Sequence, residues 1–236
     1  MNSSNIFSSI LKREIIQILF RPTLDWYDDM VSLATPFEPK FDEWRAKGGN
    51  ITLFSPKDKR ALEIYSDHIT FVCEGDIDSD FGFKQVSILI NEITKNYSSI
   101  KTIRRVACRR TYIYGSDFNF SDLTDLLYKK LFNNNEDLFS IHNGKIKDLA
   151  YIVDTIDNGC NTHVQIGAAK KEESVNNFGP KFATIKLPED DNNLFFDTDI
   201  FISENLDSKN ILENLAKVYD INHQTVKKYL DFLSKK

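Results

Sequence analysis

The sequence predicts an α+β protein of two similar lobes, each a mainly antiparallel sheet covered by a long helix. Two observations lead to this prediction. Short runs rich in β-branched and aromatic residues follow one another with turn residues between them, as in antiparallel hairpins. Each group of runs is accompanied by a longer segment whose apolar residues recur every three or four positions, as in a helix that packs on a sheet. We place the lobes at residues 1–118 and 119–236 and expect them to pack as one unit.

The first lobe is predicted to begin with a strand at residues 14–21, after a mobile lead-in. A helix should follow, with an apolar face formed by Leu24, Tyr27, Val31 and Ala34. The helical spacing of Phe37, Phe41 and Trp44 predicts a second short helix. The remaining elements of this lobe are expected to be strands at 51–55, 60–66 and 68–74, a helix over 83–97 and a strand over 102–114.

The second lobe is predicted to repeat this pattern. A helix is expected over 121–132, and the final helix should begin near Asp207. The segment AAKKEESVNNFGP, at 168–180, is polar and predicts a long hairpin loop. Strands are expected at 138–142, 146–155, 162–169, 182–187 and 194–203.

Composition and charge exclude several classes of protein. The hydrophobic content of 41% is that of a globular chain, and the net charge of −5 gives no general attraction to nucleic acid. The three cysteines are far apart and lack metal-ligand spacing, so we expect reduced thiols in a cytoplasmic protein, with no metal and no cofactor. No apolar stretch approaches the ~18 residues that span a bilayer, so we expect no membrane partner.

Two charged strands are the main candidates for a site. Strand alternation places Arg105 and Arg109 on one face, about 13 Å apart. Asp197 and Asp199 share a face of a later strand, about 7 Å apart. The arginines suit either an anion contact or a structural clamp, and the aspartates suit Mg²⁺, acid/base chemistry or ion pairs. We favour the clamp, and predict that Arg105 or Arg109 pairs with Asp197 or Asp199 across adjacent strands.

These two strands carry a resemblance to a sporadically distributed prokaryotic family of unknown function. That family has a central R-[IV]-G-L-R-Y-x-N strand and a late D-[IV]-D-x-[FY] strand before a closing helix. Here Arg105–Arg109 (RVACR) and Asp197–Phe201 (DTDIF) stand at those positions. The resemblance extends over about residues 14–233. The central motif departs from the family pattern at Ala107, Cys108, Arg110 and Tyr112.

The resemblance implies a prokaryotic origin and, through the sporadic distribution of the family, carriage in mobile or defence-linked gene clusters. It brings no catalytic residues that could be assigned to this chain.

The C-terminal segment can be interpreted in two ways. Ile211, Leu215, Val218 and Val226 lie on one stripe of a single helix that would pack on the sheet, which is the interpretation we favour. Residues 215–230 also resemble a helix-turn-helix, although Asp220 stands where the turn usually has glycine. In that alternative the DNA-contacting residues would be Asn222, Gln224, Thr225, Lys227 and Lys228.

We therefore expect a non-catalytic binding or adaptor protein with a protein partner. The sequence has no nucleophile elbow, P-loop, dinucleotide fingerprint or HExxH motif. A DNA-binding regulator is the alternative, with nucleic acid the less favoured partner. A metal-dependent enzyme at Asp197 and Asp199 is the third hypothesis. The sequence does not identify the ligand, the oligomeric state or the pathway.

Overall fold

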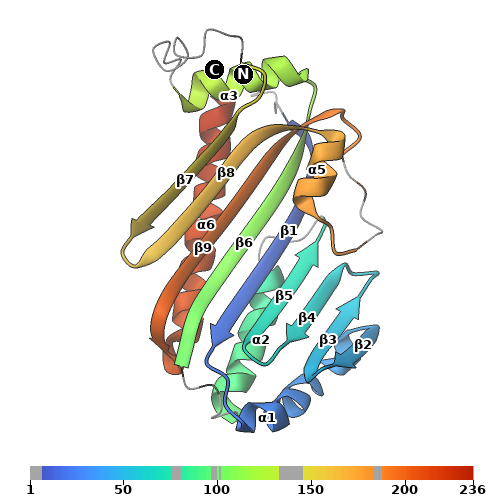
Figure 1. Ribbon diagram of the computed structural model, residues 1–236, viewed down its shortest axis with the longest axis vertical. Helices are drawn as coiled ribbons and strands as arrows, with labels where there is room; N and C mark the ends of the chain where they lie inside the picture. Colours follow the sequence, from blue (N-terminus) through green and yellow to red (C-terminus); the bar gives the residue numbers. More distant parts are fainter. Residues whose placement is uncertain are drawn as a thin grey trace.

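The computed structural model describes residues 7–75, 81–96, 100, 102–132, 146–182, 186 and 188–235. Nine of its strands form one antiparallel sheet in the order β2-β3-β4-β5-β1-β6-β9-β8-β7 (Figure 1). The strands are β1 (Phe7–Phe20), β2 (Glu43–Lys47), β3 (Asn50–Ser55), β4 (Arg60–Ile64), β5 (His68–Glu74), β6 (Thr102–Ser116), β7 (Ala150–Asp157), β8 (Cys160–Lys170) and β9 (Asn192–Asp207). The helices are α1 (Asp25–Ala34), α2 (Phe81–Asn96), α3 (Phe120–Leu131), α5 (Lys171–Phe178) and α6 (Ile211–Ser234), with 3-10 turns η1 (Glu38–Lys40) and η2 (Ser208–Asn210).

The α+β class is confirmed, and so are the antiparallel sheet and the long C-terminal helix. The expectation of a separate sheet for each lobe requires correction. The first strand of the chain lies between β5 and β6, and β6 pairs with β9 over almost its full length. Strands from before and after residue 118 are therefore hydrogen-bonded neighbours in one sheet.

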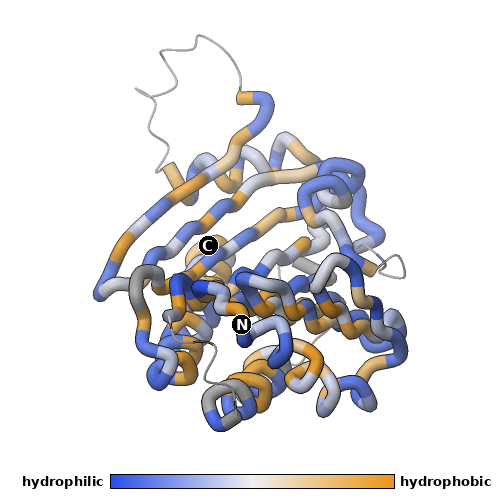
Figure 2. The backbone as a smooth tube through the Cα atoms, turned by 60° about the horizontal axis from the view of Figure 1, so that its bottom comes forward, coloured by the Kyte–Doolittle hydropathy of each residue, from blue (hydrophilic) through white to orange (hydrophobic). Residues whose placement is uncertain are grey.

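The two faces of the sheet differ in what covers them. Helices α2 and α6 pack on one face, behind the sheet in Figure 1, and α5 lies in front of the other. Because strand residues alternate between faces, Ile16, Ile18 and Phe20 of β1 are directed into the helix-covered core. The same alternation is visible as changing colour along the strands in Figure 2. We call the opposite side the open face.

Helix α1 has its buried side where the sequence did not indicate it. The prediction of a face made by Leu24, Tyr27, Val31 and Ala34 is wrong for the first three, which are exposed. The buried residues are Trp26, Met30, Leu33 and Ala34. Trp26 is held there by a hydrogen bond from its Nε1 to the carbonyl oxygen of Tyr65, at 2.9 Å. The solvent-facing part of this helix therefore carries both apolar residues and the aspartates Asp25 and Asp28.

Three other local predictions differ from the structure. Trp44 belongs to edge strand β2 rather than to a helix, because residues 43–47 pair with β3. The expected loop at 168–180 contains α5, whose Ser174 and Phe178 are buried against the sheet. Strand β1 begins at Phe7, inside the expected lead-in. The strand expected at 138–142 lies outside the described residues, as does most of the one expected at 182–187.

None of the helices in the described part of the chain has the length and apolar character needed to cross a membrane.

A buried ion pair lies at the centre of the helix-covered face. Arg110 Nε donates to Glu14 Oε2 at 2.7 Å, and both side chains are almost completely inaccessible to solvent. The guanidinium carbon of Arg110 lies 4.2 Å from the ring centroid of Tyr219 in α6. Gly82 of α2 lies against the carboxylate, and a Cβ there would overlap Glu14 Oε1. The pair therefore connects β1 and β6 to both long helices.

This geometry gives a first prediction. Arg110→Met should lower the free energy of unfolding by about 3–5 kcal/mol, because it leaves the buried Glu14 carboxylate with only the more distant Lys12 ammonium, which lies 3.7 Å from Oε2. The double variant Glu14→Leu/Arg110→Met should recover part of that loss, since apolar residues can replace a buried ion pair, while Lys12, whose side chain is 10% exposed, loses its carboxylate partner. Urea denaturation of both variants measures the difference. Equal or greater destabilisation of the double variant would contradict the interpretation.

Candidate functional site

The open face carries two ion pairs between β6 and β9, which we call the clamp: Arg105, Arg109, Asp197 and Asp199. Arg105 Nη2 lies 2.6 Å from Asp199 Oδ2. Arg109 Nε lies 3.1 Å from both carboxylate oxygens of Asp197, and its Nη2 lies 3.1 Å from Oδ2. The predicted pairing across adjacent strands is therefore confirmed for both arginines.

Strand register explains which residues pair. Arg109 lies directly opposite Asp199, while Asp197 lies opposite Thr111. The hydroxyl of Thr111 donates to Asp197 Oδ1 at 2.5 Å, and Arg109 reaches the same carboxylate diagonally. Arg105 then extends along the sheet to Asp199, and its guanidinium carbon lies 4.4 Å from the ring centroid of Phe201. The side chains are thus fixed by contacts to both strands.

The Arg109–Asp197 pair is exposed unequally. The Asp197 side chain is 3% exposed and the Arg109 side chain is 45% exposed, so the carboxylate lies beneath and the cation faces solvent. In the other pair the two side chains are equally shielded, at 23% and 24%. Burial lowers the pKa of Arg109, but the hydrogen bond to Asp197 and the charges of both aspartates outweigh it and raise the pKa overall. Arg109 therefore presents a permanent positive charge.

A third arginine lies beside the clamp on β1. Arg13 is opposite Thr111, one diagonal step from Arg109. Its Nη1 donates to the Gly179 carbonyl oxygen at 2.8 Å, and its guanidinium lies over the ring of Phe178. Burial lowers the pKa of Arg13; the charge of Glu74 opposes this shift and the positive charge of Arg109 adds to it. Among the described residues, Arg13 Nε has no hydrogen-bond acceptor.

The clamp does not resemble a metal or acid/base site. Each aspartate is engaged by an arginine, so neither has two free oxygens directed at a common point. Over the described ranges, no cluster of three or more His, Cys, Asp or Glu side chains could hold a metal ion.

The C-terminal segment is one helix, so the helix-turn-helix alternative is wrong. Helix α6 runs without a turn from Ile211 to Ser234. Asn222, which that alternative assigns to DNA contact, is buried against the sheet. Its Nδ2 donates to the Cys108 carbonyl oxygen at 2.7 Å, and its Oδ1 accepts from the Thr198 hydroxyl at 3.0 Å. Asn222 therefore fixes the helix to β6 and β9 and cannot contact DNA.

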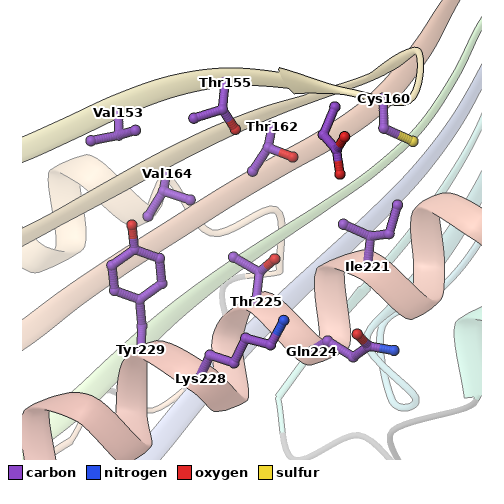
Figure 3. A pocket seen from close by; sticks show the side chains of 11 residues that line it. Val153, Thr155, Cys160, Thr162, Val164, Ile221, Gln224, Thr225, Lys228 and Tyr229 are labelled. Carbon is purple, nitrogen blue, oxygen red and sulfur yellow. The ribbon is translucent and has the colours of Figure 1, made fainter.

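The other residues of that alternative separate into two groups. Lys227 is exposed on the outer side of α6. Gln224, Thr225 and Lys228 line a cavity of about 380 Å³ between α6 and the β7–β8 hairpin (Figure 3). The hairpin contributes valine and threonine side chains to the wall: Val153, Thr155, Thr162 and Val164. The cavity has the size of a small-molecule site and a mixture of apolar and hydroxyl groups.

Sequence reasoning missed three parts of this region. Glu14 was not paired with Arg110 because 96 residues separate them. Arg13 was not singled out because its neighbours come from β6 and from the segment after α5. The cavity was missed because neither the sequence of the β7–β8 hairpin nor that of α6 indicates how far apart the two elements lie. Alternation of Val153 with Thr155 gave the only signal there.

The clamp makes a prediction that compares two aspartates of one strand. Asp197→Ala should lower the free energy of unfolding by about 2–3 kcal/mol, because Arg109 and Thr111 both donate to this buried carboxylate. Asp199→Ala is the matched control and should cost about 1 kcal/mol or less, since its pair is partly solvated. Urea denaturation measures both variants. Equal losses would show that burial does not distinguish the two pairs.

Comparison with known proteins leaves the chain without an assigned family. No protein-family model matches it, and no curated protein matches it. The family resemblance of the two charged strands therefore stays a prediction.

Proposed function

We propose that this protein is a non-catalytic binding or adaptor protein that holds an acidic segment of a protein partner on its open sheet face. The observation that carries the proposal is the unequal exposure of the Arg109–Asp197 pair. A buried carboxylate orients a solvent-facing guanidinium, which can still donate hydrogen bonds to a carboxylate of the partner. Such an arrangement suits recognition, because the arginine is already fixed before binding.

The surroundings of Arg109 favour an acidic rather than a basic partner. Arg13 lies one diagonal step away, and the positive charges of the two arginines act on each other. Burial is the main cause of the lowered pKa of Arg13, and the positive charge of Arg109 adds to it. A carboxylate placed between the two arginines would offset that repulsion. Arg105 extends the row of cations along the same strand.

The open face also offers a scaffold of suitable rigidity. Antiparallel sheets can present one solvated face while the other is packed. Here Asn222 and the Glu14–Arg110 pair fix the packed side, so the open-face side chains stand on a supported sheet. Residues 179–182 border this surface, because the backbone N–H groups of Lys181 and Phe182 donate to Glu74.

The proposal includes the expectations about family and catalysis. We retain membership of the sporadically distributed prokaryotic family, with its implied linkage to mobile or defence gene clusters, as part of this proposal. Turnover of a nucleotide, nucleic acid or ester substrate by the purified protein would contradict the non-catalytic assignment.

The binding prediction uses a synthetic peptide of alternating glutamate and glycine. We expect it to bind the full chain, with an affinity that falls as salt is added, because the contact is partly exposed. Arg109→Gln should weaken binding about tenfold, by removing charge-assisted hydrogen bonds. Arg109→Lys should lie between the wild type and Arg109→Gln, since it keeps the charge but loses the planar fork. Isothermal titration calorimetry gives the three affinities.

The controls separate recognition from general charge. Arg104→Gln removes an exposed arginine of the same strand outside the clamp and should leave binding unchanged. A peptide with glutamine in place of glutamate should not bind. Equal binding of the two peptides, or an equal effect of the Arg104 and Arg109 substitutions, would refute the proposed site.

A further inference from the structure

The edge of the sheet opposite the cavity has a free strand with an unusual surface. All five residues of β2 are exposed, and among the described strands this one has a neighbour on one side only, β3. Trp44 points to the helix-covered side, as does its partner Leu53, yet its exposed fraction is 58%. An exposed edge strand with a large aromatic residue is a template for pairing with another strand.

The helix beside this edge has a second apolar stripe. Leu24, just before α1, and Tyr27 and Val31 within it lie three or four positions apart on one flank of the helix and are 88%, 49% and 62% exposed. The inner side of the same helix is buried in the core. The first turn of α1 is acidic, with Asp25 and Asp28 exposed, so the exposed apolar residues form a stripe beside this acidic side of the helix.

A groove joins the stripe to the edge strand. Its volume is about 260 Å³, and it is bordered by α1, β2 and β3. Its walls are mainly apolar and include Val31, Ala34, Trp44, Ala46, Ile51 and Leu53. Edge strand, groove and helix stripe therefore form one continuous apolar surface on the same side of the sheet.

We propose that this surface is a homodimer interface, in which β2 pairs antiparallel with β2 of a second copy about a twofold axis at Trp44. In that register Trp44 lies opposite Trp44 of the second copy, and Glu43 lies opposite Arg45 of the second copy, twice by symmetry. Opposite charges directly across an antiparallel pair stabilise it. The axis is perpendicular to the sheet, so both α1 helices lie on the same side, with the tryptophan pair between them.

The charges select both the occupant and the register. Arg45 is partly oriented already, because its guanidinium carbon lies 4.6 Å from the ring centroid of Phe54. Its Nη2 lies 3.9 Å from Glu43 Oε2 of the same strand, and because both side chains are exposed this contact is weak and can be exchanged for the one across the joint. A register centred on Arg45 would place Arg45 opposite itself, which is unfavourable. When two copies of the E-W-R sequence pair with the axis at the tryptophan, each glutamate lies opposite an arginine. When the axis is at the arginine, two arginines lie opposite each other. Charged residues on an edge strand normally prevent pairing with other strands. Here Glu43 and Arg45 allow pairing with a second copy in the register centred on Trp44.

The experiment is sedimentation velocity of the full chain over a range of concentrations. The wild type should form a dimer. Arg45→Glu should raise the dissociation constant about tenfold or more, because each carboxylate then meets another across the joint. The double variant Glu43→Arg/Arg45→Glu exchanges the two charges, restores complementarity about the same axis and should dimerise again. Both positions are exposed, so neither variant should alter folding, which circular dichroism checks.

Tryptophan fluorescence supplies an independent readout. The chain has two tryptophans, and Trp26 is already buried in the monomer. Dilution of the wild type should therefore increase quenching by acrylamide through Trp44 alone, and Trp44→Phe should abolish the change. A wild type that remains monomeric at high concentration overturns the proposal. So does a dimer unaffected by Arg45→Glu, or a double variant that stays as monomeric as the single one.

Discussion

Alternation along β6 is the constraint on which the rest of the structure depends. Consecutive residues of a strand face opposite sides, so Arg109 and Arg110 are directed to different environments. Arg110 enters the core and requires the carboxylate of Glu14, because a buried guanidinium without a partner would be very costly. Arg109 reaches the open face and rests on Asp197. Strand β6 thus supplies both Arg110, which connects the sheet to the helices, and Arg109, which faces solvent.

The packed side converts this alternation into a rigid platform. Arg110 contacts Tyr219 of α6, and Asn222, one turn further along, bonds to β6 and to Thr198 of β9. These polar contacts occur within an otherwise apolar layer. If α6 were shifted along the sheet, the buried polar groups would lose their hydrogen-bond partners, which is unfavourable. The helix is consequently fixed in position along the sheet. That fixation is what lets the clamp hold its side chains in place on the other side.

The three candidate functional surfaces lie at different places on the sheet. The clamp occupies the open face of the central strands, the cavity lies between α6 and the β7–β8 edge, and the proposed dimer joint lies at the β2 edge. Figure 1 shows β6 and β9 within the sheet and β7 and β2 at its two edges. A twofold axis perpendicular to the sheet at β2 would leave both clamps on the same side of the joined sheet. Two acidic segments, or two parts of one partner, could then be held by one dimer, which would increase the effective affinity for a repetitive partner.

The amino-acid sequence determined the elements with a strong repeat. The strands around the arginines and aspartates and the stripe of α6 follow from periods of two and of three to four residues, and like faces of adjacent strands made the clamp predictable. Only the tertiary structure decided the place of β1 between β5 and β6, because Glu14 pairs with Arg110, which is 96 residues away in the sequence.

The tertiary structure also decided the conformation of the elements at the edges of the sheet. The spacing of Phe37, Phe41 and Trp44 fits a helix, but the backbone of residues 43–47 gains a ladder with β3. The polar segment at 171–178 became helical because Ser174 and Phe178 could be buried on the sheet. The local sequence gives such segments only a weak preference for helix or strand. Long-range hydrogen bonds and burial then determine their conformation.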